Sequence, residues 1–172
     1  MKYKNFEEIP VWNDAVSLAV KVFHLTEDRA FRGRGDIANQ IQRATLSISN
    51  NIAEGFERGT TAELLQFLYY AKGSTGEVRS ILHVIDRIDA FNHLKSEISN
   101  LKSVSLSISR QLGGWSFSLQ ESDIRGSRHL TEKSKTSYHR KQRQTKVEKL
   151  IQENYEKAME EIRKKRKNKP EN

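Results

Sequence analysis

The side chains that could do chemistry in this chain of 172 residues are mainly basic, with 30 lysines and arginines against 22 aspartates and glutamates. Residues 1–120 hold 14 basic and 13 acidic side chains, whereas residues 121–172 hold 16 and 9. A cationic segment binds nucleic-acid phosphates with salt-sensitive affinity. The sequence therefore predicts RNA or another nucleic acid as a partner, and a merely solubilising tail is the alternative.

No pattern of residues predicts an active site. The chain has no cysteine, which excludes a disulfide scaffold, a thiolate metal site and a cysteine nucleophile. Its five histidines do not follow a metal-ligand spacing. Asp86 and Asp89 could meet on one helix, which makes a weak case for a nuclease. We expect a protein that is not an enzyme and that needs no metal or cofactor.

The elements that must position the cations are predicted to be helices, because apolar residues recur every three or four positions. Capping residues and glycines suggest the bounds. The first helix would begin near Pro10 and end near Gly33 and Gly35. The second would begin at Asp36 and end or bend at Gly55, and the third would run from Thr60 and Glu63 to Ile88. After a turn at Phe91-Asn92-His93, the fourth would follow and end at Gly113-Gly114.

These helices predict an all-α fold, an up-and-down antiparallel four-helix bundle over residues 1–115. Residues 116–145 are polar and basic and are predicted to form a linker. Residues 146–172 are predicted to form a fifth, amphipathic and basic helix with Val147, Leu150/Ile151, Ala158 and Ile162 on one side. That helix is thin in apolar groups, so we expect it to form against a partner.

Two helix faces carry small or polar residues where a solvated face would favour Lys, Glu or Gln. On the second helix, the alternatives are a structural polar contact with a neighbouring helix or subunit, a contact with a ligand such as a phosphate backbone, and plain exposure. On the third, interior glycines indicate close backbone approach, either at a subunit interface or within the chain. The predicted oligomer interface consists of Ser47, Asn50, Asn51, Glu54, Leu65, Tyr69, Gly73, Gly76 and Ser80.

The sequence predicts a soluble, cytoplasmic protein. No apolar run approaches the roughly 20 residues that cross a bilayer. The first eight residues lack the apolar region of a signal peptide. A membrane partner is not expected.

Several stretches resemble the signature of the 23S ribosomal RNA intervening-sequence proteins, over roughly residues 6–112. The most specific is the combination of an Asn-Ile-Ala-Glu-Gly core with a downstream Gly-Ser. The matching stretches are Val11–Ala15, Gln40–Ala44, Ser47-Ile48, Asn51–Arg58, Phe67-Leu68, Ala71–Ser74 and Glu77.

The resemblance implies a four-helix bundle that assembles into a ring of five copies and that has no enzymatic activity. It also implies a link to RNA, because members are encoded inside insertions in ribosomal RNA genes. A similar fold is used by the accessory variability protein of diversity-generating retroelements, a basic ring that binds a reverse transcriptase and its template RNA. A scaffold for such an enzyme is therefore the alternative function.

The chain departs from the family pattern in two ways. Gln42 replaces one of the two arginines usual before Ala44, and about 55 residues follow the fourth helix. We therefore expect the tail to have taken over the nucleic-acid contact. The predicted nucleic-acid-binding residues are Arg43, Arg58, Lys72, Arg79, Arg140, Lys141, Arg143, Lys146, Arg163, Lys164, Lys165, Arg166 and Lys167.

Overall fold

The computed structural model describes residues 3–121, together with residues 143–144, 146–148, 152 and 156. The chain separates into two compact units, Met1–His129 and Leu130–Asn172. Of the described residues in the second unit, 146–148, 152 and 156 are helical, as the predicted fifth helix requires, and residues 143–144, expected in the linker, are helical as well. The first unit contains η1 (Phe6–Glu8), α1 (Pro10–Thr26), η2 (Arg29–Phe31), α2 (Gly35–Glu57), α3 (Thr61–Ile85), η3 (Asp89–Leu94) and α4 (Lys95–Gln120).

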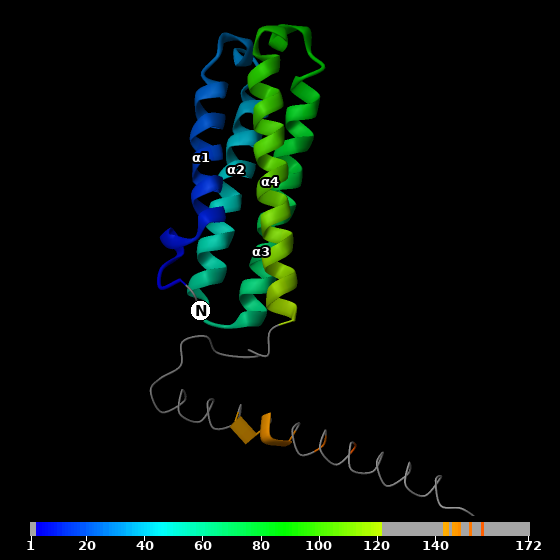
Figure 1. Ribbon diagram of the computed structural model, residues 1–172. Coiled ribbons are helices and arrows are strands. Elements are labelled where there is room, and N and C mark those ends of the chain that lie inside the picture. The colour runs from blue at the N-terminus through cyan, green and yellow to red at the C-terminus, as the bar shows by residue number, and fades with distance from the viewer. Residues whose placement is uncertain (1–2, 122–142, 145, 149–151, 153–155, 157–172) are drawn as a thin grey trace, which may run out of the picture. The chain divides into compact units, whose positions relative to one another are not determined.

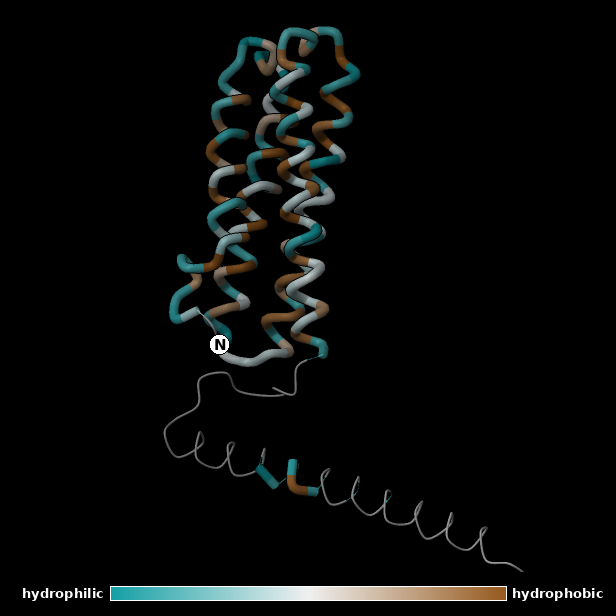
Figure 2. The backbone as a smooth tube through the Cα atoms, in the orientation of Figure 1, coloured by the Kyte–Doolittle hydropathy of each residue, from teal (hydrophilic) through white to brown (hydrophobic). Residues whose placement is uncertain are grey.

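The four long helices form the predicted bundle, running alternately up and down (Figure 1). α1 and α3 each pack against both α2 and α4. Apolar positions recur along every helix between hydrophilic ones (Figure 2), and their side chains meet in one core. Fully buried members of this core include Leu18, Ile48, Leu68, Leu82 and Ile108. The all-α prediction is confirmed.

Two predicted helix starts are confirmed. Pro10 occupies the first turn of α1, where its missing N–H removes no helical hydrogen bond. Thr60 caps α3: its Oγ1 accepts a hydrogen bond from the backbone N–H of Glu63 at 3.2 Å and donates one to Glu63 Oε2 at 2.6 Å. The short turn between α2 and α3 therefore ends at Thr60, whose side chain is held by these two hydrogen bonds.

The first helix is shorter than predicted. α1 ends at Thr26 rather than near Gly33 and Gly35. Asp28 ends the helical run because its Oδ1 accepts a hydrogen bond from the N–H of Ala30 at 2.7 Å, which starts η2. α2 begins at Gly35, and Asp36 lies in its first turn rather than acting as the cap.

Glycines end neither the second nor the fourth helix. α2 passes through Gly55 to Glu57, and α4 passes through Gly113-Gly114 to Gln120. Packing accounts for both: Gly55 lies against α3, while Trp115 and Leu119 pack on the core beyond the glycine pair. Residues 116–120, expected in the linker, therefore belong to α4.

The connection between α3 and α4 also differs from the prediction. α3 ends at Ile85, before the expected Ile88, and the turn predicted at 91–93 is part of η3. Phe91 is buried and packs edge-on against Phe31 of η2, with ring centroids 4.8 Å apart. Within the described part of the chain, no helix is both long and apolar enough to cross a membrane.

Candidate nucleic-acid interface

Polar side chains between α2 and α3 form hydrogen bonds within the bundle. Ser47 Oγ of α2 lies 3.0 Å from Ser74 Oγ of α3, within hydrogen-bonding distance. Asn51 Nδ2 donates to the Ser47 carbonyl at 2.7 Å and to Ser47 Oγ at 2.9 Å. Ser47 and Asn51 therefore make the intrachain polar contact, whereas Asn50 on the same helix is exposed.

Arg58, at the end of α2, is neutralised by two carboxylates. Its Nη2 lies 2.5 Å from Glu54 Oε1, and its Nη1 lies 3.8 Å from Glu63 Oε1. The hydrogen bond to Glu54 raises the pKa of Arg58 above its ordinary value. The guanidinium also lies 5.0 Å from the centre of the Phe67 ring. These contacts give Arg58 a structural role at the α2/α3 corner.

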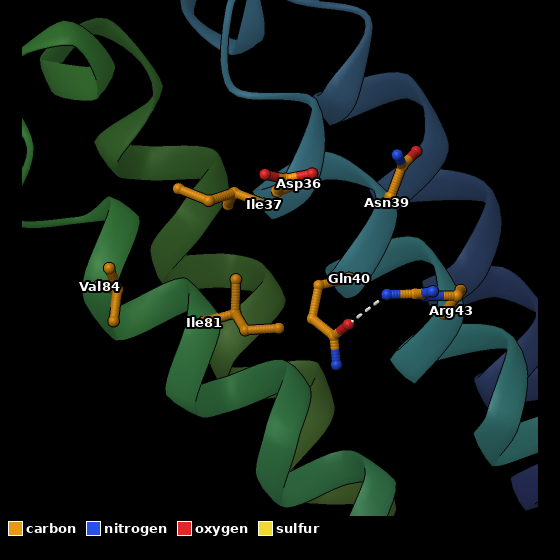
Figure 3. A pocket seen from close by; sticks show the side chains of 7 residues that line it. All are labelled: Asp36, Ile37, Asn39, Gln40, Arg43, Ile81 and Val84. Carbon is orange, nitrogen blue, oxygen red and sulfur yellow. Dashed lines mark hydrogen bonds between the residues drawn. The ribbon is translucent and has the colours of Figure 1, made fainter.

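Arg43 lies at a groove between α2 and α3 of about 540 Å³ (Figure 3). Its Nη2 donates to Gln40 Oε1 at 2.6 Å, and Gln40 Nε2 donates in turn to Glu77 Oε1. The chain of hydrogen bonds holds Arg43 toward α3. The groove is lined by Asp36, Ile37, Asn39, Gln40, Arg43, Ile81 and Val84.

The opposite side of α3, which faces α4, carries cations without acidic partners. Lys72 and Arg110 are exposed, and Arg79 is half-buried with its Nε enclosed and without a hydrogen-bond partner. Within residues 3–121, none of the three forms an ion pair. Lys72 and Arg110 are brought together because the Lys72 ammonium lies beside Gly113, three residues after Arg110.

An acidic group between α3 and α4 is already paired. Asp86 Oδ2 accepts a hydrogen bond from Lys102 Nζ at 2.8 Å. This bond lowers the pKa of the Asp86 carboxyl below its ordinary value of 3.8. Asp86 therefore already has Lys102 as its counter-charge.

Small residues line the same side of α3. A Cβ added to Gly73 or Gly76 would meet no atom within 4 Å, so the crowded intrachain contact considered as an alternative is wrong. Ser80 is exposed, Leu65 is half-buried, and Tyr69 Oη accepts a hydrogen bond from Gln120 Nε2 of α4 at 2.9 Å. We call this surface the α3/α4 face: Leu65, Tyr69, Lys72, Gly73, Gly76, Arg79 and Ser80 of α3, with Arg110, Gly113, Phe117 and Gln120 of α4.

The predicted cations are thus only partly brought together. Lys72 and Arg79 share the α3/α4 face with residues predicted for the oligomer interface, while Arg43 and Arg58 lie toward α2. Arg143 and Lys146 are helical and exposed. The remaining predicted cations, Arg140, Lys141, Arg163, Lys164, Lys165, Arg166 and Lys167, lie outside the described residues.

Arg110 was missed by the sequence reasoning, although a signal for it exists. No acidic residue stands three or four positions before or after it, where a helix would place an ion-pair partner. The positions there are Leu106, Ser107, Gly113 and Gly114. A cation surrounded by such residues on a helix surface is free to bind a partner from outside the chain.

A second surface, between α1 and α2, is apolar. Val20, Phe23 and Leu46 are 51%, 39% and 40% exposed. With Val16 they line a groove of about 250 Å³. Among residues 3–121 and the described positions of the tail, no group of three or more acidic or histidine side chains could hold a metal ion.

Comparisons with known proteins give a family and a fold. The model of the family described as 23S rRNA-intervening sequence protein matches residues 7–114. A solved structure from Bacteroides thetaiotaomicron, a protein of unknown function from the S23 ribosomal protein family, is similar in fold, with a TM-score of 0.54 at 19% identity. The similarity covers 61% of this chain and 96% of that one. No curated protein matches the sequence.

Proposed function

This chain belongs to the 23S rRNA-intervening sequence protein family, and from that premise we propose that it is a non-catalytic, oligomeric RNA-binding protein. The observation that carries the proposal is the α3/α4 face, where Lys72, Arg79 and Arg110 lack acidic partners beside an open helix backbone. Phosphates supply the missing counter-charge, and glycines let a bulky backbone approach closely.

The basic tail, residues 121–172, adds to this contact. It holds 16 basic and 9 acidic residues and begins directly after α4, next to Gln120 of the α3/α4 face. Contacts to phosphates carry no sequence information by themselves. We therefore expect binding that depends on charge and shape and that weakens steeply as the salt concentration rises.

We assign the contact between copies to the α1/α2 groove rather than to the glycine-bearing side of α3. The exposed side chains of Val20, Phe23 and Leu46 favour a protein surface. The side of α3 predicted for assembly carries Lys72 and Arg79 as well, and apposed like charges oppose association. This assignment leaves the α3/α4 face free for RNA in every copy, so assembly multiplies a weak contact.

RNA binding by the full chain across a salt series tests the proposal. The Lys72→Gln/Arg79→Gln/Arg110→Gln variant should bind at least about tenfold more weakly and lose two to three units, roughly, of its salt slope. A control variant, Lys21→Gln/Arg29→Gln/Arg32→Gln, removes the same charge from exposed positions in α1, in η2 and directly after η2. Equal losses in both variants would contradict a specific role for the α3/α4 face.

The mass of the protein in solution tests the assembly surface. Val20→Glu/Phe23→Glu should dissociate the oligomer, because it buries two charges in the proposed contact. Tyr70→Glu, at a tyrosine that is 50% exposed on α3, is the control and should leave the mass unchanged. A monomeric wild-type chain would defeat the assembly part of the proposal.

A further inference from the structure

We infer that the α3/α4 face binds single-stranded RNA, with unpaired bases stacked on Tyr69 and Phe117; this inference rests on the proposed function and names the form of its ligand. Both rings are uncovered. Phe117 is 65% exposed, more than the other large apolar side chains described, and Tyr69 is 45% exposed. A solvated helix gains nothing from an exposed phenyl ring, so these rings need an explanation.

The two rings belong to the same surface as the cations. Arg110, Gly113, Phe117 and Gln120 follow one another at steps of three or four residues, so they share one side of α4. Two contacts fix that side against α3. Gln120 Nε2 lies 2.9 Å from Tyr69 Oη, and a Cβ on Gly113 would lie 3.6 Å from Lys72 Nζ.

Phe117 stands between these two contacts along α4. It shares a side of α4 with Gln120 and Gly113, which contact Tyr69 and Lys72 of α3, and Arg110 lies two turns away on that side. The two aromatic residues therefore lie toward one end of a strip and the three cations toward the other, and none of these cations forms an ion pair within residues 3–121. The open positions at Gly73 and Gly76 continue this strip without side chains that would block it.

This combination of exposed rings and unpaired cations fits the chemistry of an unpaired strand. Proteins that bind single strands combine a positively charged groove along the backbone with aromatic side chains on which successive bases stack. A duplex offers no free base faces, and only its phosphates and 2′-hydroxyls could meet this strip. Stacking therefore predicts a preference for single strands, whereas the cations alone would bind either form.

A contact with a second copy is the rival use of the same rings. In a face-to-face contact, Lys72, Arg79 and Arg110 of one copy would lie near the same cations of the other. A polyanion resolves that repulsion, and a second copy of the face increases it. The charges thus favour nucleic acid as the occupant.

The experiment measures binding of the full chain to a fluorescent 12-nucleotide oligouridine and to an RNA duplex of equal length, at one salt concentration. Tyr69→Ala/Phe117→Ala should weaken binding of the single strand about tenfold or more and change duplex binding less than about twofold. Tyr70→Ala is the matched control, since it removes a ring that is 50% exposed on another side of α3, and it should change neither.

Conservative variants separate stacking from packing. Tyr69→Phe loses the hydrogen bond from Gln120 but keeps the ring, so it should bind single strands like the wild type. Phe117→Leu keeps an apolar side chain without a π-face and should lose most of the single-strand preference. Unchanged thermal unfolding in these exposed positions confirms that each variant is folded.

Three outcomes would overturn the inference. The first is an equal loss of single-strand and duplex binding in Tyr69→Ala/Phe117→Ala. The second is dissociation of the oligomer in that variant, which would assign the rings to a subunit contact. The third is wild-type binding by that variant while the Lys72→Gln/Arg79→Gln/Arg110→Gln variant still loses affinity, in which case the proposed function stands without stacking. Wild-type binding by both variants would refute the proposed function itself.

Discussion

The two sides of α3 make opposite use of polar and glycine residues. Toward α2, the space beside a glycine is filled by a neighbouring residue. A Cβ added to Gly55 of α2 would lie 2.6 Å from Phe67 Cβ of α3. There Arg58 is offset by Glu54 and Glu63. Toward α4, Gly73 and Gly76 face open space, and Lys72 has no carboxylate partner. One side is completed within the chain, whereas the other stays open among the residues that the structure describes.

The strongest test of this contrast is a methyl group at Gly55. Gly55→Ala should destabilise the bundle by about 1–3 kcal/mol, because Phe67 Cβ and the Leu64 backbone leave no room for it. Urea unfolding measures the change. A gain in stability, as helix propensity alone would give, would show that α2 and α3 can move apart at no cost.

The cap at the α2/α3 corner gives the next largest effect. Thr60→Ala removes the acceptor for the Glu63 N–H and should cost about 1 kcal/mol in urea unfolding. Thr60→Ser keeps the oxygen and serves as the control. If the two variants were equally stable, the hydrogen bond would contribute nothing to the completed side of α3.

Gly73→Ala tests the open side and should have the opposite sign. Its methyl group meets nothing within 4 Å, so the helix should gain about 0.5–1 kcal/mol of stability. The mass in solution should not change. Dissociation of the oligomer by this variant would return the glycine-bearing side of α3 to the subunit interface predicted from sequence.

The smallest effect concerns acid stability at the Asp86–Lys102 pair. Because the hydrogen bond from Lys102 lowers the pKa of Asp86, the folded chain holds its proton less tightly than the unfolded chain. That contribution to stability is present above the ordinary pKa of 3.8 and is lost as the pH falls through the lower folded value. Asp86→Asn should therefore flatten the fall in the urea midpoint between about pH 5 and about pH 2, and Lys102→Gln, which removes the donor, should do the same.

The fold could be predicted from sequence because its signals are local and periodic. The isoleucines of α2 recur at helical steps, and Thr60 and Glu63 have capping-box spacing, so helix number and order follow. Helix ends were less predictable. Gly55 and Gly113 look like stops in sequence, but tertiary packing on both sides of them keeps the helices going.

The candidate site was only half predictable, for a different physical reason. Sequence gives the charge of Arg58 but not the two carboxylates that the α2/α3 corner places beside it. Arg110 and Lys72 are likewise 38 positions apart in the sequence. Only the antiparallel packing of α3 and α4 brings them to the same surface. The candidate binding cations are therefore those for which the described part of the fold supplies no acidic partner.

The glycine pair inside α4 has a consequence for dynamics. Each glycine in a helix costs about 1 kcal/mol relative to alanine, so the turns after Gly114 open locally at lower free energy than the turns before Gly113. Amide hydrogens of residues 115–120 should accordingly exchange with solvent faster than those of residues 98–112. Phe117 and Gln120 lie in this segment, so a ligand bound to them would slow its exchange. The exchange rate of residues 115–120 would then report whether the α3/α4 face is occupied.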